Sequence, residues 1–443
     1  MEDNKKIKGF SKLSKRGKIK WIVENFFKDP ETVTREMLSY WHSNEDQQKI
    51  LDGFSENTIS NFPMPYGVAP NFEINGKTYC VPMVIEESSV VAAASSAAKF
   101  WMERDGFKTE ILSTTKLGQV SFKWSGSQEL FTTHFPKIKA KLIKESKQIT
   151  NNMEKRGGGI LDIELIDLTD KEKELYQLKC SFETCDSMGA NFINSCLEQF
   201  AKSLASYVEK ELIEGKLNVI MCILSNYTPD CLVRASVECK VEDLGVFAGA
   251  MPPEVFAERF KDAVTIAHLD EYRASTHNKG IFNGVDAVVL ATGNDFRAIE
   301  ACGHTYAARN GSYRSLSYCK VENGMFKFWL DLPLAVGTVG GLTNLHPMAK
   351  RSLELLGNPS SQELMEIIAA TGLAQNFAAL RSLVTTGIQK GHMKMHLQNI
   401  LISMNASEKE IYNAVEYFKE NVVSFSAVRE FLENLRSGKQ IIA

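Results

Sequence analysis

The sequence predicts an α+β protein with a large mixed α/β domain, an inserted small split β-α-β (ferredoxin-like) domain and a mobile helical C-terminal domain. Two observations lead to this prediction. Between residues 112 and 223, short apolar runs typical of strands alternate with long segments typical of helices. On either side the patterns are mixed, and from about residue 385 they are helical. We therefore expect the large domain at 1–111 and 224–384, the small domain at 112–223, and the C-terminal domain at 385–443.

The composition is that of an ordinary globular protein, and it excludes several classes. The 443 residues are enough for about two or three domains, and the net charge of −3 argues against a dedicated nucleic-acid-binding protein. Nine cysteines without a C-x-x-C pair predict neither a disulfide framework nor a structural zinc site. There is no signal-peptide pattern and no run of about 18 or more apolar residues. We therefore expect a cytoplasmic protein without a membrane span, whose partners are small molecules.

The first part of the chain carries three local signals. Residues 1–55 mix charged and aromatic residues at helical spacing, which predicts an arm of one or two amphipathic helices. Residues 74–77, INGK, are typical of a two-residue hairpin turn. The stretch 88–101, SSVVAAASSAAKFW, opens with serines suited to an N-cap and continues in small residues, which predicts a tightly packed helix. Glu86 and Glu87 lie just ahead of it.

The inserted region can be divided into six elements. Their order predicts a split β-α-β sheet with its helices on one face. We expect strands at 118–124, 160–168, 175–183 and 217–224, and helices at 135–152 and 188–212.

A lone lysine stands in the stretch STHNKGIF, between His277, Asn278 and a glycine. The apolar run GVDAVVLATGND follows, and we interpret it as a buried strand with Asp295 at its exit. Lys279 precedes Asp295 by 16 residues, which suits a loop followed by one strand. A lysine and a carboxylate near strand ends indicate chemistry, although a solvated lysine and a turn aspartate remain the structural alternative.

Several separated motifs, in this order, resemble the hydroxymethylglutaryl-CoA reductases, in their soluble bacterial (class II) form. They include PMVIEESSVVAAAS, DSMGANFIN, the lysine stretch described above, GTVGG and GLAQNFAALRSLVTTGIQKGHMKMH, and the resemblance runs from about residue 10 to 435. It implies an enzyme of the mevalonate pathway of isoprenoid biosynthesis. That enzyme reduces 3-hydroxy-3-methylglutaryl-CoA to mevalonate and CoA with two NAD(P)H. The resemblance also implies a homodimer, or a multiple of dimers, with the active site at the interface.

The resemblance assigns four catalytic residues whose types suit this chemistry. The reaction places negative charge on one carbonyl oxygen twice, so a fixed cation helps, and Lys279 paired with Asp295 would provide it. Glu87 would supply a proton to the carbonyl of the aldehyde intermediate, although a position before a helix favours the ionised carboxylate, which a general acid must avoid. His392 would protonate the departing CoA thiolate from the mobile tail.

Other positions match the family's binding residues. Arg273 and Ser89 would hold the substrate carboxylate, and Asn283 would lie near the thioester. Gln375 and Asn376 would lie on the CoA side. The nicotinamide cofactor would bind at Asp186, Met188, Gly189, Asn191 and Asn226, where glycine permits close backbone approach and a helix N-terminus faces phosphate. We expect no metal, because His392 and His396, four residues apart, have no third ligand in the sequence.

The choice of cofactor depends on the segment 146–156. NADH-using relatives typically carry an aspartate before the glycine triplet, where it binds the adenosine ribose and repels a 2′-phosphate. The matching positions, Thr150 to Asn152, have no acidic side chain, whereas Lys147, Lys155 and Arg156 lie nearby. We therefore expect a preference for NADPH, with NADH possible.

Three alternatives stay open at this stage. The enzyme can work in the reverse, mevalonate-degrading direction with NAD. It can be another nicotinamide-dependent acyl-CoA reductase on the same scaffold. It can also be a coenzyme-binding module without catalysis, although all four expected catalytic residues are present.

Overall fold

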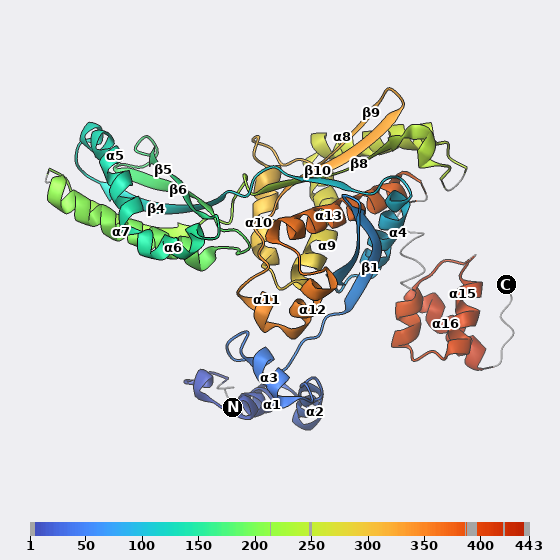
Figure 1. Ribbon diagram of the computed structural model, residues 1–443. Coiled ribbons are helices and arrows are strands. Elements are labelled where there is room, and N and C mark those ends of the chain that lie inside the picture. Colours follow the sequence, from blue (N-terminus) through green and yellow to red (C-terminus); the bar gives the residue numbers. More distant parts are fainter. Residues whose placement is uncertain are drawn as a thin grey trace.

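The structure is a computed structural model that describes residues 5–212, 214–247, 250–385, 387, 397–419 and 421–437. It contains three sheets, one of two strands and two of four strands (Figure 1). Three separate clusters of buried apolar side chains lie in the described part of the chain. The largest joins residues 69–107 to residues 231–380, the second lies within 120–212, and the third within 397–432. The mixed α+β fold with an inserted unit is therefore confirmed.

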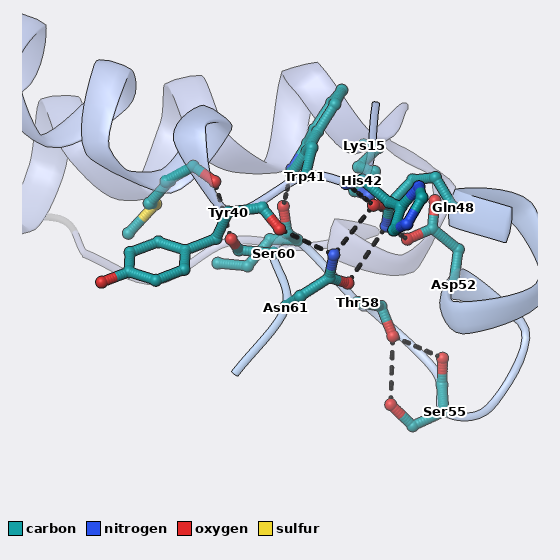
Figure 2. A network of polar contacts seen from close by, with 12 residues as sticks. Lys15, Tyr40, Trp41, His42, Gln48, Asp52, Ser55, Thr58, Ser60 and Asn61 are labelled. Carbon is teal, nitrogen blue, oxygen red and sulfur yellow. Dashed lines mark hydrogen bonds and ion pairs between the residues drawn. The ribbon is translucent and has the colours of Figure 1, made fainter. Parts of the chain in front are cut away.

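The N-terminal arm contains three α-helices instead of one or two: α1 (Lys15–Phe26), α2 (Pro30–Ser39) and α3 (Glu45–Asp52). Each begins at a residue whose side chain accepts a backbone N–H, which ends the previous segment and starts a new helix. Figure 2 shows Gln48 within a network of polar contacts that connects parts of this arm. Its Oε1 accepts from His42 N and Asn61 Nδ2, and its Nε2 donates to Asp52.

The hairpin signal is confirmed. Strands β1 (Tyr66–Ile74) and β2 (Lys77–Val84) pair antiparallel across the predicted turn. Asn75 and Gly76 have φ of 50° and 80°. This left-handed geometry belongs to the tight turns that match strand twist, and it favours Asn followed by Gly.

The small-residue helix is also present, as α4 (Val90–Met102). Ala94, Ala97 and Ala98 are fully buried, which allows the close packing against β1 and α13 that the sequence predicts. Its N-cap residue is Ser89, as expected, but the side chain does not cap the helix. Ser89 has φ 76°, a strained left-handed conformation for a residue other than glycine.

The inserted unit follows the predicted order of elements, but two consecutive helices stand where a single helix was expected at 135–152. In chain order it contains β4 (Lys116–Trp124), α5 (Gln128–Glu145), α6 (Lys147–Glu154), β5 (Gly159–Asp167), β6 (Leu175–Glu183), α7 (Ala190–Glu211) and β7 (Leu217–Leu224). Its strand order is β5-β6-β4-β7, and every pair is antiparallel, as in a ferredoxin-like sheet. Residues along β6 are alternately buried, so one face of the sheet carries the core shared with α5 and α7.

The second four-stranded sheet has the order β3-β8-β10-β9. Its strands are β3 (Lys108–Ile111), β8 (Leu232–Lys240), β9 (Ser317–Glu322) and β10 (Met325–Pro333). The helices of this region are α8 (Pro253–Leu269), α9 (Glu271–Ala291), α10 (Phe296–Ala307), α11 (Leu342–Leu345), α12 (Pro347–Leu355) and α13 (Ser361–Val384). Helix α13 packs against α9, α4 and β8, and in Figure 1 it runs through the centre of this region.

The predicted strand before Asp295 is wrong. Residues 271–291 form the single helix α9, and Lys279 lies in its middle. The reason is that α9 is enclosed on several sides, so its second half is apolar around most of its circumference, and a short apolar run cannot separate a buried helix from a strand. Gly284 marks the helix packing, because a Cβ there would lie 2.8 Å from the carbonyl oxygen of Thr371 in α13.

Helix α13 is the one described helix that is long and apolar enough, by length and composition alone, to cross a membrane. However, 72% of its most apolar window is buried inside the protein. It serves as the central core helix of the region around β8, which explains its composition.

The described C-terminal segment is helical, as predicted, with α15 (Glu408–Tyr417) and α16 (Phe425–Arg436). A capping box of Ser407 and Glu410 starts α15, and Arg436 of α16 pairs with Glu410 at 2.7 Å. These helices share an apolar cluster of their own, separate from the other two.

Candidate active site

Helix α9 brings together two of the expected catalytic residues. Lys279 Nζ lies 2.6 Å from Glu87 Oε2, although the two residues are 192 positions apart in the sequence. Asn283, one helical turn after Lys279, donates from Nδ2 to the same oxygen at 3.3 Å. Glu87 stands in the loop just before α4. The side chains of Lys279 and Glu87 are 61% and 36% exposed, so a ligand can reach the pair from solvent.

Asp295 is not part of this cluster in the described chain. It is the N-cap of α10, where its Oδ1 accepts from the backbone N–H groups of Arg297 and Ala298, and it also pairs with the Arg297 guanidinium. The expected contact with Lys279 assumed a loop and a strand. From Lys279 to Ala291 the helix rises by about 18 Å, so Lys279 lies in the middle of α9 whereas Asp295 lies beyond its end, at the start of α10.

Two polar groups expected at the substrate carboxylate lack partners in the described chain. The Ser89 hydroxyl is buried and makes no hydrogen bond. Arg273, in the first turn of α9, is half-buried, and its guanidinium makes no ion pair or hydrogen bond with a described residue. Burial lowers the pKa of Arg273. A buried hydroxyl and a half-desolvated guanidinium without partners are both groups that a bound carboxylate would satisfy.

The two residues before Lys279 anchor α9 in the core. Asn278 is fully buried, its Nδ2 donates to Arg314 O, and its Oδ1 accepts from Leu316 N. His277 Nε2 lies 2.7 Å from the Ser317 hydroxyl, and burial lowers the pKa of His277 to about 3. These contacts explain why a histidine and an asparagine precede the lysine: their side chains fasten α9 to residues 314–317.

The buried network also includes Asn376. The Ser317 hydroxyl donates to Asn376 Oδ1 at 2.7 Å, so its single proton is used and His277 must be the donor to it. Asn376 and Gln375 are only 1% and 6% exposed. Asn376 thus has an internal structural partner, which differs from the expected position beside CoA, while the Gln375 Oε1 is buried without a hydrogen bond. A fully buried amide on a core helix cannot be told from a ligand-binding amide by sequence.

The residues expected at the cofactor gather around the start of α7. Gly189 is its N-cap with φ 94°, and no side chain caps the first turn. Met188 directly precedes it, and Asn191 is exposed in the first turn. Asp186 is engaged with the large region, because its Oδ1 accepts from Ser361 N at the start of α13, at 2.8 Å.

A narrow hollow lies beside this helix start and next to α10. Met188 and Asn226, both expected at the cofactor, contribute to its lining together with Thr228, Ala298 and Cys302. The sequence did not reveal its most unusual lining residue, Lys116, which is 4% exposed. Lys116 Nζ donates to Thr184 Oγ1 and Ser187 O, and burial lowers its pKa. The strand KLGQVSFKW is of mixed composition and carries a second lysine, Lys123, so no clear sequence signal marks Lys116.

The segment 146–156, which we expect to select the cofactor, starts at Ser146 between α5 and α6, includes all of α6 and ends two residues after it. Lys147 is paired with Glu154 at 2.6 Å, and the buried Thr150 hydroxyl donates to the same carboxylate. Two exposed cations, Lys155 and Arg156, remain next to the glycine triplet.

His392 and His396 both lie outside the described residues. Within the part of the chain that the structure describes, no three His, Cys, Asp or Glu side chains gather as a metal site requires.

Comparisons with known proteins show which family this chain resembles. The family model of hydroxymethylglutaryl-coenzyme A reductase matches residues 19–397. The 3-hydroxy-3-methylglutaryl-coenzyme A reductase of Archaeoglobus fulgidus is 37% identical over 434 residues, covering 98% of this chain and 95% of that protein. A probable reductase of Borreliella burgdorferi is 32% identical over 445 residues, with coverages of 98% and 96%.

A solved structure shows the same likeness. It is the class II reductase of Streptococcus pneumoniae bound to NADPH in open conformations, with a TM-score of 0.70 and 37% identity, covering 92% of this chain and 98% of that one. The matching family model, the two full-length relatives and the shared architecture establish that this chain belongs to the hydroxymethylglutaryl-coenzyme A reductase family.

Proposed function

We propose that this protein reduces 3-hydroxy-3-methylglutaryl-CoA to mevalonate and free CoA with two molecules of NAD(P)H, as a step of isoprenoid biosynthesis. The observation that carries this proposal is the cluster of Lys279, Glu87 and Asn283 on the open side of α9. It presents a cation, a carboxyl group and an amide to solvent at one place, where a thioester carbonyl can bind.

Lys279 stabilises the oxyanion in both reductive steps. Negative charge develops on the carbonyl oxygen when the thioester is reduced and again when the aldehyde is reduced. An ammonium group that is already in place stabilises each transition state without having to reorganise. Its partner Glu87 and the rigid helix beneath it keep the ammonium in position.

Glu87 supplies the proton that turns the aldehyde oxygen into the alcohol, and it must take up a proton before that step, because the carboxylate that pairs with Lys279 has none to give. It accepts hydrogen bonds from both Lys279 and Asn283, so it lies within reach of any oxygen that these two donors bind. His392 would give a proton to the CoA thiolate when that leaves. The sulfur then departs as a thiol, and the aldehyde stays bound for the second reduction.

Arg273 and Ser89 hold the carboxylate end of the substrate. Both groups lack hydrogen-bond partners in the described chain, and an arginine fork can bind a carboxylate through two parallel hydrogen bonds. The open side of α9 would thus bind the acyl group at both ends, with Arg273 about 1.7 turns before Lys279.

The start of α7 suits a nicotinamide cofactor. The uncapped first turn after Gly189 offers backbone N–H groups to phosphate, Asn191 lies in this turn, and Met188 and Asn226 line the hollow beside it. The cofactor supplies the hydride in each step. Asp186 fixes this loop to α13 through Ser361, so the phosphate-binding turn keeps a defined place relative to α9.

We propose NADPH as the preferred cofactor. The pairing of Glu154 with Lys147 leaves Lys155 and Arg156 as the exposed charges beside the glycine triplet, which would attract a 2′-phosphate. The NADPH in the Streptococcus pneumoniae relative supports this choice. Arg156→Ala should then lower kcat/KM for NADPH and spare NADH. Lys173→Ala, at the opposite end of the same sheet, should change neither.

We also propose a homodimer, or a multiple of it, in the cytoplasm. Because about 18 Å of helix separates Lys279 from the end of α9, the Asp295 of a second subunit could meet Lys279 more easily than the Asp295 of the same subunit.

The three apolar clusters support the domain division expected from sequence, with boundaries near 111, 223 and 384.

One assay tests the proposed function. Cofactor oxidation and released thiol are measured together with 3-hydroxy-3-methylglutaryl-CoA, using NADPH and NADH in parallel. We expect two cofactors oxidised for each thiol released and a higher kcat/KM for NADPH. One cofactor per thiol would show a reductase that stops at the aldehyde. Absence of thiol release would contradict the proposal.

A further inference from the structure

Gly280 differs from every other glycine that the structure describes. Each of the others either has a positive φ, which a side chain would strain, or has atoms within 4 Å of the place where a Cβ would stand. Gly280 has neither a positive φ nor any such neighbour. Neither the backbone nor the packing of the described chain requires a glycine there.

This glycine is also in an unfavourable place. It lies in the interior of α9, a helix of 21 residues, where glycine is among the least favourable residues because it leaves the backbone too free in the unfolded chain. An alanine at this position would favour the helix and meet nothing. The reason for the glycine must therefore come from something that approaches α9 from outside.

Gly284, one turn later, shows the opposite situation. A Cβ at Gly284 would lie 2.8 Å from the Thr371 carbonyl oxygen and 2.9 Å from Gln375 Cβ. Gly284 is required by the contact with α13. The two glycines of α9 thus have different causes and form a matched pair for experiment.

The helical spacing places Gly280 inside the expected substrate site. Arg273 is seven residues before Gly280 and Asn283 three after it, so all three share one side of the helix. Lys279 is adjacent, and its Nζ is bonded to Glu87. The open space over Gly280 therefore lies between a guanidinium without a described partner and the carbonyl-binding cluster.

We propose that Gly280 is a specificity-determining residue, whose missing side chain makes room for the acyl group of the substrate to lie directly against α9. The inference rests on the proposed function. The acyl group carries a carboxylate at one end and the thioester carbonyl at the other. With the carboxylate at Arg273 and the carbonyl at Lys279 and Asn283, the carbon chain between them crosses over Gly280.

The test compares Gly280→Ala, Gly280→Val and Gly284→Ala with the wild type. Melting temperature, oligomeric state, and kcat and KM for both 3-hydroxy-3-methylglutaryl-CoA and mevaldehyde are measured for each. Mevaldehyde is used because it has the same carboxylate end but no CoA. We expect Gly280→Ala to melt at or above the wild-type temperature, since the helix gains a better residue and no clash.

The same variant should keep its oligomeric state and lose about tenfold or more in kcat/KM for both substrates, mainly through KM. Gly280→Val should lose more activity. Gly284→Ala should instead lower the melting temperature, because its methyl group has no space beside Thr371.

Several results would overturn the inference. Unchanged kcat/KM in Gly280→Ala would show that nothing approaches this position. A lower melting temperature or an altered oligomeric state would show that the glycine serves the fold or a subunit contact. A loss with the CoA thioester alone would place CoA, and not the acyl group, over Gly280. If the wild type itself does not turn over either substrate, the proposed function fails. If the wild type is active and Gly280→Ala equals it, only the inference about Gly280 fails.

Discussion

The two sides of helix α9 are built in opposite ways. On the buried side, His277 and Asn278 are hydrogen-bonded to the segment 314–317, and Gly284 touches α13. On the open side, the described hydrogen bonds of the Lys279 and Asn283 side chains go to the carboxylate of Glu87, and a Cβ at Gly280 would have no neighbour within 4 Å. The buried side is satisfied by the protein, whereas the open side is left for a ligand.

This difference shows how one helix can be rigid and reactive at once. Each buried hydrogen bond fixes the rotation of α9 about its axis, and the rotation decides where Lys279 points. Substitutions on the buried side should therefore change stability first, and those on the open side should change catalysis first.

The largest effect is expected for Lys279→Ala. Removing the ammonium takes away the positive charge that stabilises the oxyanion. The loss of transition-state stabilisation should be about 3 kcal/mol or more, and kcat should fall accordingly with both the thioester and mevaldehyde. The melting temperature should change little, because the side chain is 61% exposed. Steady-state kinetics and thermal unfolding measure both. Lys320→Ala, which removes a comparably exposed lysine paired with Glu322, is the control and should leave both unchanged. Near-normal turnover by Lys279→Ala would remove this lysine from the mechanism.

Asn278→Ala tests the buried side. The change leaves Arg314 O and Leu316 N without partners inside the protein, which should cost about 2–3 kcal/mol of the free energy of unfolding. Denaturant unfolding measures this loss, and Asn283→Ala on the open side of the same helix is the control. Equal stability of the two variants would refute the distinction between the two sides.

The sequence predicted the inserted unit far better than α9, and the reason is physical. One face of the sheet there is buried and the other is not, so strands such as β6 alternate in burial along their length and can be recognised by their period. Helix α9 packs against α13, β2 and α8, and most residues of its second half are buried, so these residues carry no clear period. The motif residues Glu87, Lys279 and Asn283 were found, but neither the role of His277 nor the reason for Gly280 is visible without neighbours.

Acid should weaken the buried side in a defined window. The pKa of His277 is about 3 in the folded protein because of burial, and about 6.5 in an unfolded chain. Below pH 6.5 the unfolded state binds a proton that the folded state refuses. Stability is therefore full above this pH and is lost as pH falls toward 3, by about 1 kcal/mol between pH 6.5 and 5.5.

Denaturant unfolding at several pH values measures this loss. His277→Gln can still donate to Ser317 but does not titrate, so its stability should fall less steeply over the same range. Identical pH dependence in the two proteins would show that His277 is not the group responsible.

The smallest effect is expected for Asn283→Ala. Its hydrogen bond to Glu87 is long, at 3.3 Å, and partly exposed. Its loss should lower kcat/KM two- to fivefold, which corresponds to about 0.5–1 kcal/mol of transition-state stabilisation, with no loss of folding stability. Kinetics with both substrates measure this change. A loss as large as that of Lys279→Ala would move Asn283 into a more central role than its geometry supports.

The most direct test of the open side is a double-variant cycle on its central pair. If Glu87 and Lys279 work as one unit, either single change already breaks that unit. The kcat of the double variant Glu87→Gln with Lys279→Ala should then be no lower than the kcat of the less active single variant. Kinetics of the wild type, both single variants and the double variant give the coupling energy. We predict strong non-additivity. Losses that simply add would show that the two residues act independently, and would contradict the account of α9 as the helix that aligns them.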